Sequence, residues 1–179
     1  MPLALAPLFD EIHRRWIDLI LATYPSDASG FLSHERDPFA NPVGSTIRRA
    51  TATLLENLMT ERTGQTSEAL DQIVRIRSVQ DFTASGAVSF IFLLKQAVTD
   101  VAGDLVAADA RAWVELDGKI DGLALEAFDV FMRCREQLYT IRLAEHDRWN
   151  ASARLKRQRE LPVHSNVHRR TDRKENPRK

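Results

Sequence analysis

The stretch Ala84-Ser-Gly-Ala-Val-Ser-Phe-Ile-Phe-Leu-Leu-Lys95 decides the fold that we expect for this chain of 179 residues. Drawn as a helix, it is apolar on nearly every side, through Val88 and the run from Phe90 to Leu94. A helix that is apolar all round is normally buried. We therefore expect a helix from about Ala84 to Val106 at the centre of a helical bundle.

Four more helices are expected around this central one. Apolar residues recur at spacings of three and four, as a helix with one buried face requires, over about Ala6–Tyr24, Pro42–Arg62, Ser67–Gln80 and Ala108–Arg157. Gly118 and Gly122 are candidate breaks in the last and longest of them. No run of alternating β-branched residues competes, so the predicted class is all-α: a bundle of about five helices with a long C-terminal helix.

The charges divide the chain into a body and a tail. Residues 154–179 hold ten Lys/Arg and three Asp/Glu, which gives the tail a net charge of +7 and leaves −7 on the rest. Beyond Arg159 the sequence has too few apolar residues to offset the loss of chain entropy on folding. We predict a helical domain over 1–158 and a disordered basic tail over 159–179. Whether that tail contacts nucleic acid or anionic lipid, or only aids solubility, stays open at this point.

Composition argues against several classes of protein. The longest strongly apolar run, Ala87 to Leu94, is far shorter than the roughly 18 residues of a membrane-spanning helix, so we expect a cytoplasmic protein. The lone cysteine, Cys134, excludes an internal disulfide and a paired-cysteine zinc site. The common nucleotide-binding, hydrolase and metalloprotease motifs are missing, so we expect no enzyme and no metal or cofactor. His13, beside Phe9 and Ile17, is only a weak candidate for a cofactor ligand.

Two cations interrupt apolar helix faces, at Arg77 and Lys95. A buried charge without a partner is costly, so each should meet a carboxylate or a bound anion, and Asp81 and Asp37 are the candidate carboxylates. Two interpretations remain: a site for a small anion or a switchable ion pair, and a fixed structural pair with side chains reaching toward the surface.

The loop Asp37-Pro38-Phe39-Ala40-Asn41-Pro42-Val43-Gly44 is unusually well specified for a connector. Its prolines fix the backbone, Asn41 can cap a helix that starts at Pro42, and Gly44 permits close approach of another element. Phe39 offers an apolar anchor. Docking of the loop on the bundle explains these features, and a ligand or partner site is the alternative.

The apolar stripe of the longest predicted helix reaches further than short neighbours would cover. Such a stripe either pairs with a second copy, which predicts a homodimer, or packs inside the chain's own bundle.

Three blocks resemble a known family: the loop Asp37–Gly44, the segment Ile73-Val-Arg-Ile-Arg-Ser-Val-Gln-Asp-Phe82, and the stretch Ala84–Lys95. Together with Trp16-Ile-Asp-Leu-Ile-Leu-Ala-Thr-Tyr-Pro25, they are similar to the N-terminal domain of the RsbT co-antagonist proteins of the RsbRD type, over about residues 8–105.

The resemblance implies a helical signal-input domain of bacterial stress signalling, which binds protein partners in stressosome-like assemblies. Short stand-alone relatives of the DsrT type are associated with sulfur metabolism, and they suggest a small-ligand or cofactor-binding accessory protein as the alternative. The co-antagonists carry a downstream STAS domain, whereas this sequence continues into a helix and a basic tail, so its output is left open.

Overall fold

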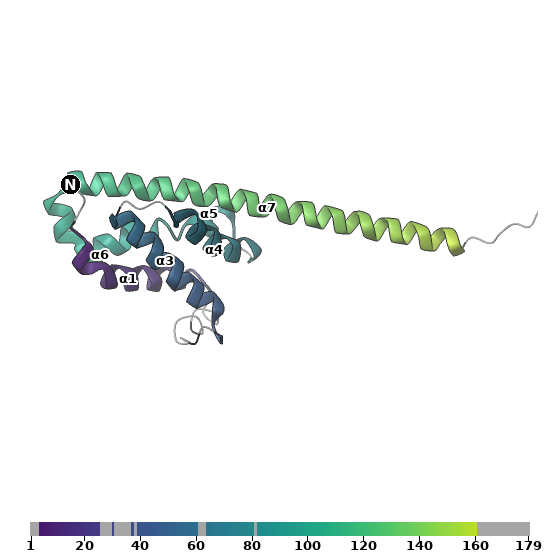
Figure 1. The fold of residues 1–179 in the computed structure, drawn as a ribbon, viewed down its shortest axis with the longest axis horizontal. Helices are drawn as coiled ribbons and strands as arrows, with labels where there is room; N and C mark the ends of the chain where they lie inside the picture. The colour runs from purple at the N-terminus through teal and green to yellow at the C-terminus, as the bar shows by residue number, and fades with distance from the viewer. Residues whose placement is uncertain are drawn as a thin grey trace, which may run out of the picture. The chain divides into compact units, whose positions relative to one another are not determined.

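The computed structural model describes residues 4–25, 30, 37, 39–60, 64–80 and 82–160. The chain forms two compact units, Met1–Leu138 and Tyr139–Lys179. The all-α prediction is confirmed, because the described residues form helices joined by turns and contain no strand (Figure 1). None of these helices has a stretch long and apolar enough to cross a lipid bilayer.

The helical elements follow one another through short connections. In chain order they are η1 (Ala6–Leu8), α1 (Phe9–Leu21), α3 (Pro42–Thr60), α4 (Thr66–Val79), α5 (Ala84–Val88), α6 (Leu93–Ala108) and α7 (Ala110–Glu160). Among the described elements, the five with more than ten residues correspond to the five expected helices.

The first unit is a bundle built on α1. This helix packs against α6 on one side and α3 on another, α3 packs against α4, and α4 contacts α5 (Figure 1). Side chains spaced three or four residues apart on α1 fill the centre of the core, where Ile12, Trp16 and Ile20 are fully buried. The periodicity of the sequence therefore predicted the inward face of α1 correctly.

The expected continuous helix over Ala84–Val106 is wrong, because the chain leaves the α-helical pattern between Ser89 and Phe92. Here the backbone N–H groups of Ile91 and Phe92 bond to carbonyls three residues back, as from Phe92 to Ser89 at 3.0 Å. The carbonyl of Phe90 instead accepts a hydrogen bond of 2.7 Å from Nε1 of Trp16 on α1. A contact with a distant helix thus divides this segment into α5 and α6.

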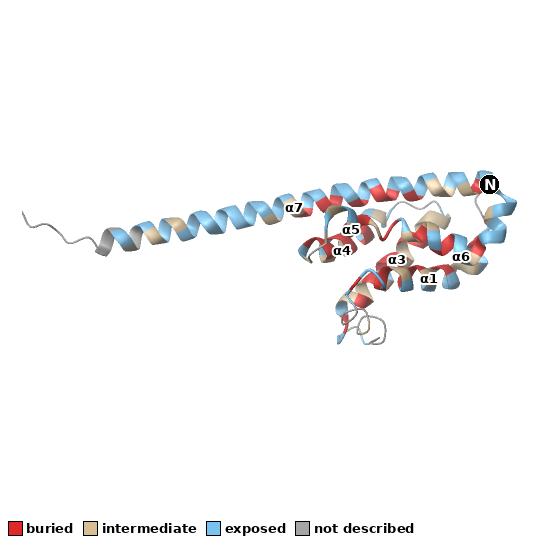
Figure 2. Ribbon diagram, turned by 180° about the vertical axis from the view of Figure 1, so that it is seen from behind, coloured by how far each residue is buried: buried red, intermediate tan, exposed pale blue. Residues whose placement is uncertain are grey.

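Helix α7 begins at Ala110 and continues to Glu160. Gly118 and Gly122 lie inside it and do not break it, although each glycine costs a helix about 1 kcal/mol relative to alanine. Within the first unit one side of α7 is buried in the core, through Ile120, Leu123, Ala124, Ala127, Val130, Phe131 and Cys134. The other side is exposed (Figure 2).

In the second unit the described side chains of α7 are exposed, apart from the half-buried Asn150 and Ala153. They include the large apolar residues Tyr139, Ile141, Leu143 and Trp149. The predicted basic tail lies outside the described residues from position 161 onward, and the predicted boundary at 158 stays a prediction.

Candidate functional site

The signature loop leads into α3 through a side-chain cap. Oδ1 of Asn41, which is 1% exposed, accepts a hydrogen bond of 2.8 Å from the backbone N–H of Gly44. Asn41 therefore caps α3 at the third helical residue, with Pro42 in the first position, and the predicted helix start is confirmed. A Cβ on residue 44 would lie 2.8 Å from Cγ of Asn41, so only glycine leaves room for the capping side chain of Asn41.

The remaining loop residues do not dock as expected. The side chain of Phe39 is 96% exposed, so it does not anchor the loop on the bundle. Oδ1 of Asp37 accepts the N–H of Phe39 at 2.9 Å, and the carbonyl of Asp37 accepts the N–H of Asn41 at 2.8 Å. These contacts hold Asp37 within its own loop. Pro38 lies outside the described residues.

Arg77 of α4 is fully buried, at 0% exposure, inside an aromatic cage formed by Tyr24, Phe82 and Phe90. Its guanidinium carbon lies 5.2, 4.5 and 5.4 Å from the respective ring centroids. Cations are attracted to ring faces at such distances, most strongly where water is excluded. Tyr24 and Phe82 also contact each other edge to face, with centroids 5.4 Å apart, which closes this side of the cage.

Hydrogen bonds complete the surroundings of Arg77. Nη1 donates to the carbonyl of Gly86 at 3.1 Å, and Nη2 donates to Oγ1 of Thr23 at 2.5 Å. Nε lies 3.5 Å from the hydroxyl of Tyr24. The prediction that Arg77 meets a carboxylate is not met within the described part of the chain, where rings, hydroxyls and carbonyls surround it. The candidate partner Asp81 lies outside the described residues.

Lys95, near the start of α6, meets two carboxylates of α7. Its Nζ lies 2.8 Å from Oδ1 of Asp117 and 2.7 Å from Oδ1 of Asp121. Partial burial alone would lower the pKa of Lys95, but the hydrogen bonds and charges of the two aspartates outweigh it and raise that pKa. The expectation of a carboxylate partner is correct for Lys95, but the partners are these two residues and not Asp37.

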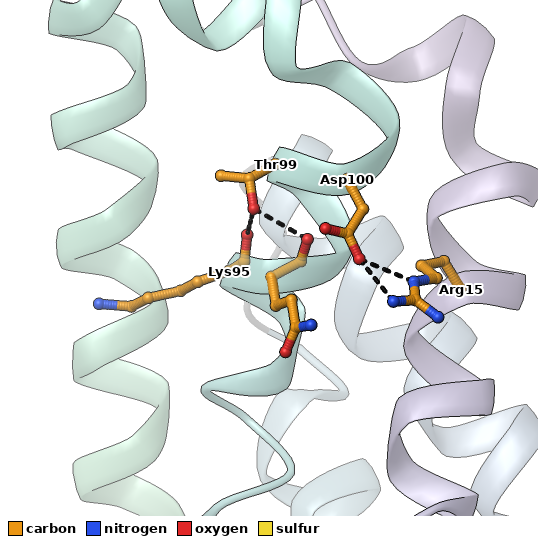
Figure 3. A network of polar contacts seen from close by, with 5 residues as sticks. Arg15, Lys95, Thr99 and Asp100 are labelled. Carbon is orange, nitrogen blue, oxygen red and sulfur yellow. Dashed lines mark hydrogen bonds and ion pairs between the residues drawn. The ribbon is translucent and has the colours of Figure 1, made fainter.

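A second ion pair ties α6 to α1. Nη2 of Arg15 lies 2.7 Å from Oδ2 of Asp100, and Nε of Arg15 donates to the same oxygen at 2.8 Å. Figure 3 shows the Lys95 side chain extending away from this pair. One side of α6 therefore forms an ion pair with α1, and another side forms ion pairs with α7. Spacing could not identify either pair, because their members come from different helices.

His13 is held by a structural contact. Its Nε2 lies 2.9 Å from Oγ1 of Thr51 on α3, and that hydroxyl donates to the carbonyl of Ile47 at 2.7 Å. Burial lowers the pKa of His13, against the smaller raising effects of a hydrogen bond at the Arg48 backbone and of the charge on Asp10. Within the described ranges, no group of three or more His, Cys, Asp or Glu side chains is arranged to hold a metal ion.

An open depression lies beside His13 on the surface of α1 and α3. It has a volume of about 550 Å³, and its lining includes the cations Arg14 and Arg48 together with the acids Asp10 and Asp18. The mixed charge suits a small polar ligand better than an apolar one. Sequence reasoning missed this depression, because its two walls are about thirty residues apart along the chain.

Comparison with known families gives a match to the RsbT co-antagonist protein rsbRD N-terminal domain over residues 10–146. The matched region runs from α1 through the caged Arg77 and the Lys95 ion pairs, and it extends along α7 past the end of the first unit. No curated protein and no solved structure gives a significant match. Since the match covers well over half of the sequence, this chain belongs to the RsbRD N-terminal domain family.

Proposed function

We propose that this chain is a cytoplasmic, non-catalytic signal-input module of the stressosome type, which passes its signal to a separate protein partner. The family match over residues 10–146 is the observation that carries the proposal, because this family is a regulatory input domain. The contacts of three polar residues support a structural rather than a chemical use: Arg77 fills the aromatic cage, Lys95 joins α6 to α7, and His13 bonds to Thr51.

The second unit supplies the surface that we assign to the partner. Ile141 and Leu143 are 55% and 66% exposed, and Trp149 is 70% exposed. Ile141 and Trp149 are eight residues apart and lie within about 80° of each other, on one side of the helix, whereas Leu143 lies on another side. Large apolar residues on one side of a helix are the anchors of helix-in-groove binding. The partner that we expect is therefore a protein with an apolar groove, such as a STAS-domain protein of the same cell.

Complementation of a gene deletion tests this proposal. The wild-type gene should restore the transcriptional response to stress, whereas Ile141→Ser combined with Trp149→Ala should restore less than a tenth of it. The control is Val79→Ser, because Val79 is an equally exposed apolar residue, at 69%, on α4. Full activity of the double variant, at equal protein level, would sink the assignment of this surface, and no effect of the deletion itself would sink the proposed function.

The depression beside His13 favours a second candidate, a small-anion-binding accessory protein linked to sulfur metabolism as in the DsrT-type relatives. Sulfite, sulfate and phosphate are suitable probes, because Arg14 and Arg48 can bind oxyanions. The candidate predicts that one of these anions raises the melting temperature of the wild type by several degrees but not that of Arg14→Gln combined with Arg48→Gln. Equal responses of both proteins would eliminate it.

A further inference from the structure

The depression beside His13 has a balanced set of charges. Its charged lining residues are Asp10, Arg14 and Asp18 of α1 and Arg48 of α3. Burial lowers the pKa of His13, so this side chain adds no charge at neutral pH. Two acids and two cations cancel, so an ion of either sign meets repulsion as well as attraction in the depression, whereas a ligand with both charges can satisfy both.

Arg14 lies between the two acids along α1. Asp10 precedes it by four residues and Asp18 follows it by four, so neighbouring side chains in this row are about 6 Å apart along the helix. All three residues are exposed, and in the part of the chain that the structure describes Arg14 forms no ion pair with either acid. An acid and a guanidinium that lie one turn apart without joining can bind the two ends of a small dipolar ligand.

A second row of side chains supplies the apolar part of the lining. Ile17 and Leu21 follow His13 by four and eight residues, so they share the side of α1 from which His13 bonds to Thr51 of α3. They line the depression although they are only 8% and 5% exposed. Apolar lining with a few polar groups that fix orientation is typical of small-molecule sites, and the volume of about 550 Å³ leaves room for such a ligand.

We infer that this depression binds a free α-amino acid with an apolar side chain, and that this amino acid is the signal of the input module. In such a ligand one carbon atom separates the ammonium group from the carboxylate, so the ammonium group can bind Asp10 or Asp18 while the carboxylate binds Arg14. Its side chain then lies toward Ile17 and Leu21. The inference rests on the proposed function, because it names the class of signal that the module receives.

A thermal-shift screen of the standard L-amino acids against the full chain tests this inference. Because the depression is open to water on one side, we expect a dissociation constant of about 1 mM. An amino acid present at about 10 mM should then raise the melting temperature by about 3 °C. Valine, leucine or isoleucine should give the largest shift, and no shift with any amino acid would overturn the inference.

Probes that carry only one of the two charges distinguish this site from a site for simple ions. For valine they are isobutylamine, which lacks the carboxylate, and isovalerate, which lacks the ammonium group. Each should give less than about a third of the shift caused by valine, because it meets one attractive group beside a repulsive one. A shift with isovalerate equal to that with valine would refute the amino acid and favour the anion-binding candidate instead.

Variants of the charged row test where the ligand binds. Asp10→Asn combined with Asp18→Asn should abolish the shift caused by the amino acid, and so should Arg14→Gln. The matched control is Glu11→Gln, which also removes an acid from the first turn of α1 but at an exposed position outside the depression, and it should respond like wild type.

Equilibrium dialysis with the radiolabelled amino acid provides a second measurement on the same variants, after circular dichroism has shown that they fold. Binding that persists in both row variants, or that is lost in Glu11→Gln as well, would refute the site. A chain that binds no amino acid but still restores the stress response would lose only this signal assignment, whereas a deletion without effect would sink the proposed function even if valine binds.

Discussion

The guanidinium carbon of Arg77 lies 4.5 Å from the ring centroid of Phe82. Together with the bonds from Arg77 to Thr23 at the end of α1 and to Gly86 in α5, this contact makes a buried cation the joint of three helices. A buried arginine is tolerated only where its N–H donors have acceptors, because an unpaired buried polar group costs about 1–3 kcal/mol of folding free energy.

Replacing Arg77 should therefore destabilise the first unit. Arg77→Met leaves the carbonyl of Gly86 and the hydroxyl of Thr23 without their donor, and we expect the free energy of unfolding to fall by about 1–3 kcal/mol. Arg77→Lys should also be less stable than wild type, because an ammonium group cannot reproduce the planar fork. Urea denaturation measures both effects.

The neighbouring arginine provides the control for this measurement. Arg75 is 59% exposed and pairs with Asp71 within the same helix, so Arg75→Met should leave the midpoint of urea unfolding close to that of wild type. Added phosphate should shift the melting temperatures of wild type and Arg77→Met equally. An Arg77→Met variant as stable as wild type would show that the cage does not depend on the cation.

The stabilisation from the Lys95 ion pairs should be lost at high pH. The pKa of Lys95 is raised in the folded chain, so its contribution is fully present below the unfolded pKa of about 10.4 and is lost as the pH rises through the folded pKa. Lys95→Met should thus be less stable than wild type at pH 8, by about 1 kcal/mol or less, with a smaller difference at pH 11. A difference that is equal at both pH values would contradict the role of the charge.

Two substitutions at the cap of α3 should lower stability in the same way. Asn41→Ala removes the acceptor for the N–H of Gly44 and should cost about 1 kcal/mol. Gly44→Ala keeps that acceptor but forces the Asn41 amide out of place, so it should cost at least as much. Combining them should cost less than the sum, because both remove one interaction. Strictly additive losses in thermal unfolding would mean that the glycine serves another purpose.

His13 should make the chain less stable in mild acid. Its folded pKa lies below the model-peptide value of 6.5, so the unfolded chain binds the proton more readily. Stability is then fully present above about pH 6.5 and is lost as the pH falls from there through the folded pKa. His13→Gln should flatten this dependence between pH 7 and pH 5. An unchanged slope in the variant would assign the acid sensitivity to other groups.

Much of the fold follows from local chemistry. The three- and four-residue spacing on α1 predicted that Ile12, Trp16 and Ile20 point inward, and the residues around Asn41 and Pro42 predicted where α3 begins. These features depend on neighbours within one or two helical turns, and such neighbours can be identified in the sequence. The same periodicity could not show that Ser89–Phe92 leaves the helix, because the bond from Trp16 to Phe90 joins residues 74 positions apart.

The sequence by itself determined that the chain is helical, that α7 is long, and that Arg77 and Lys95 lie on faces that are mostly apolar. Only the tertiary structure decided what meets each cation: aromatic rings and carbonyls for Arg77, and Asp117 and Asp121 for Lys95. The physical reason is that an unpaired buried charge is costly, so the sequence predicts that each cation has a partner. Which groups become the partners depends on which helices pack together.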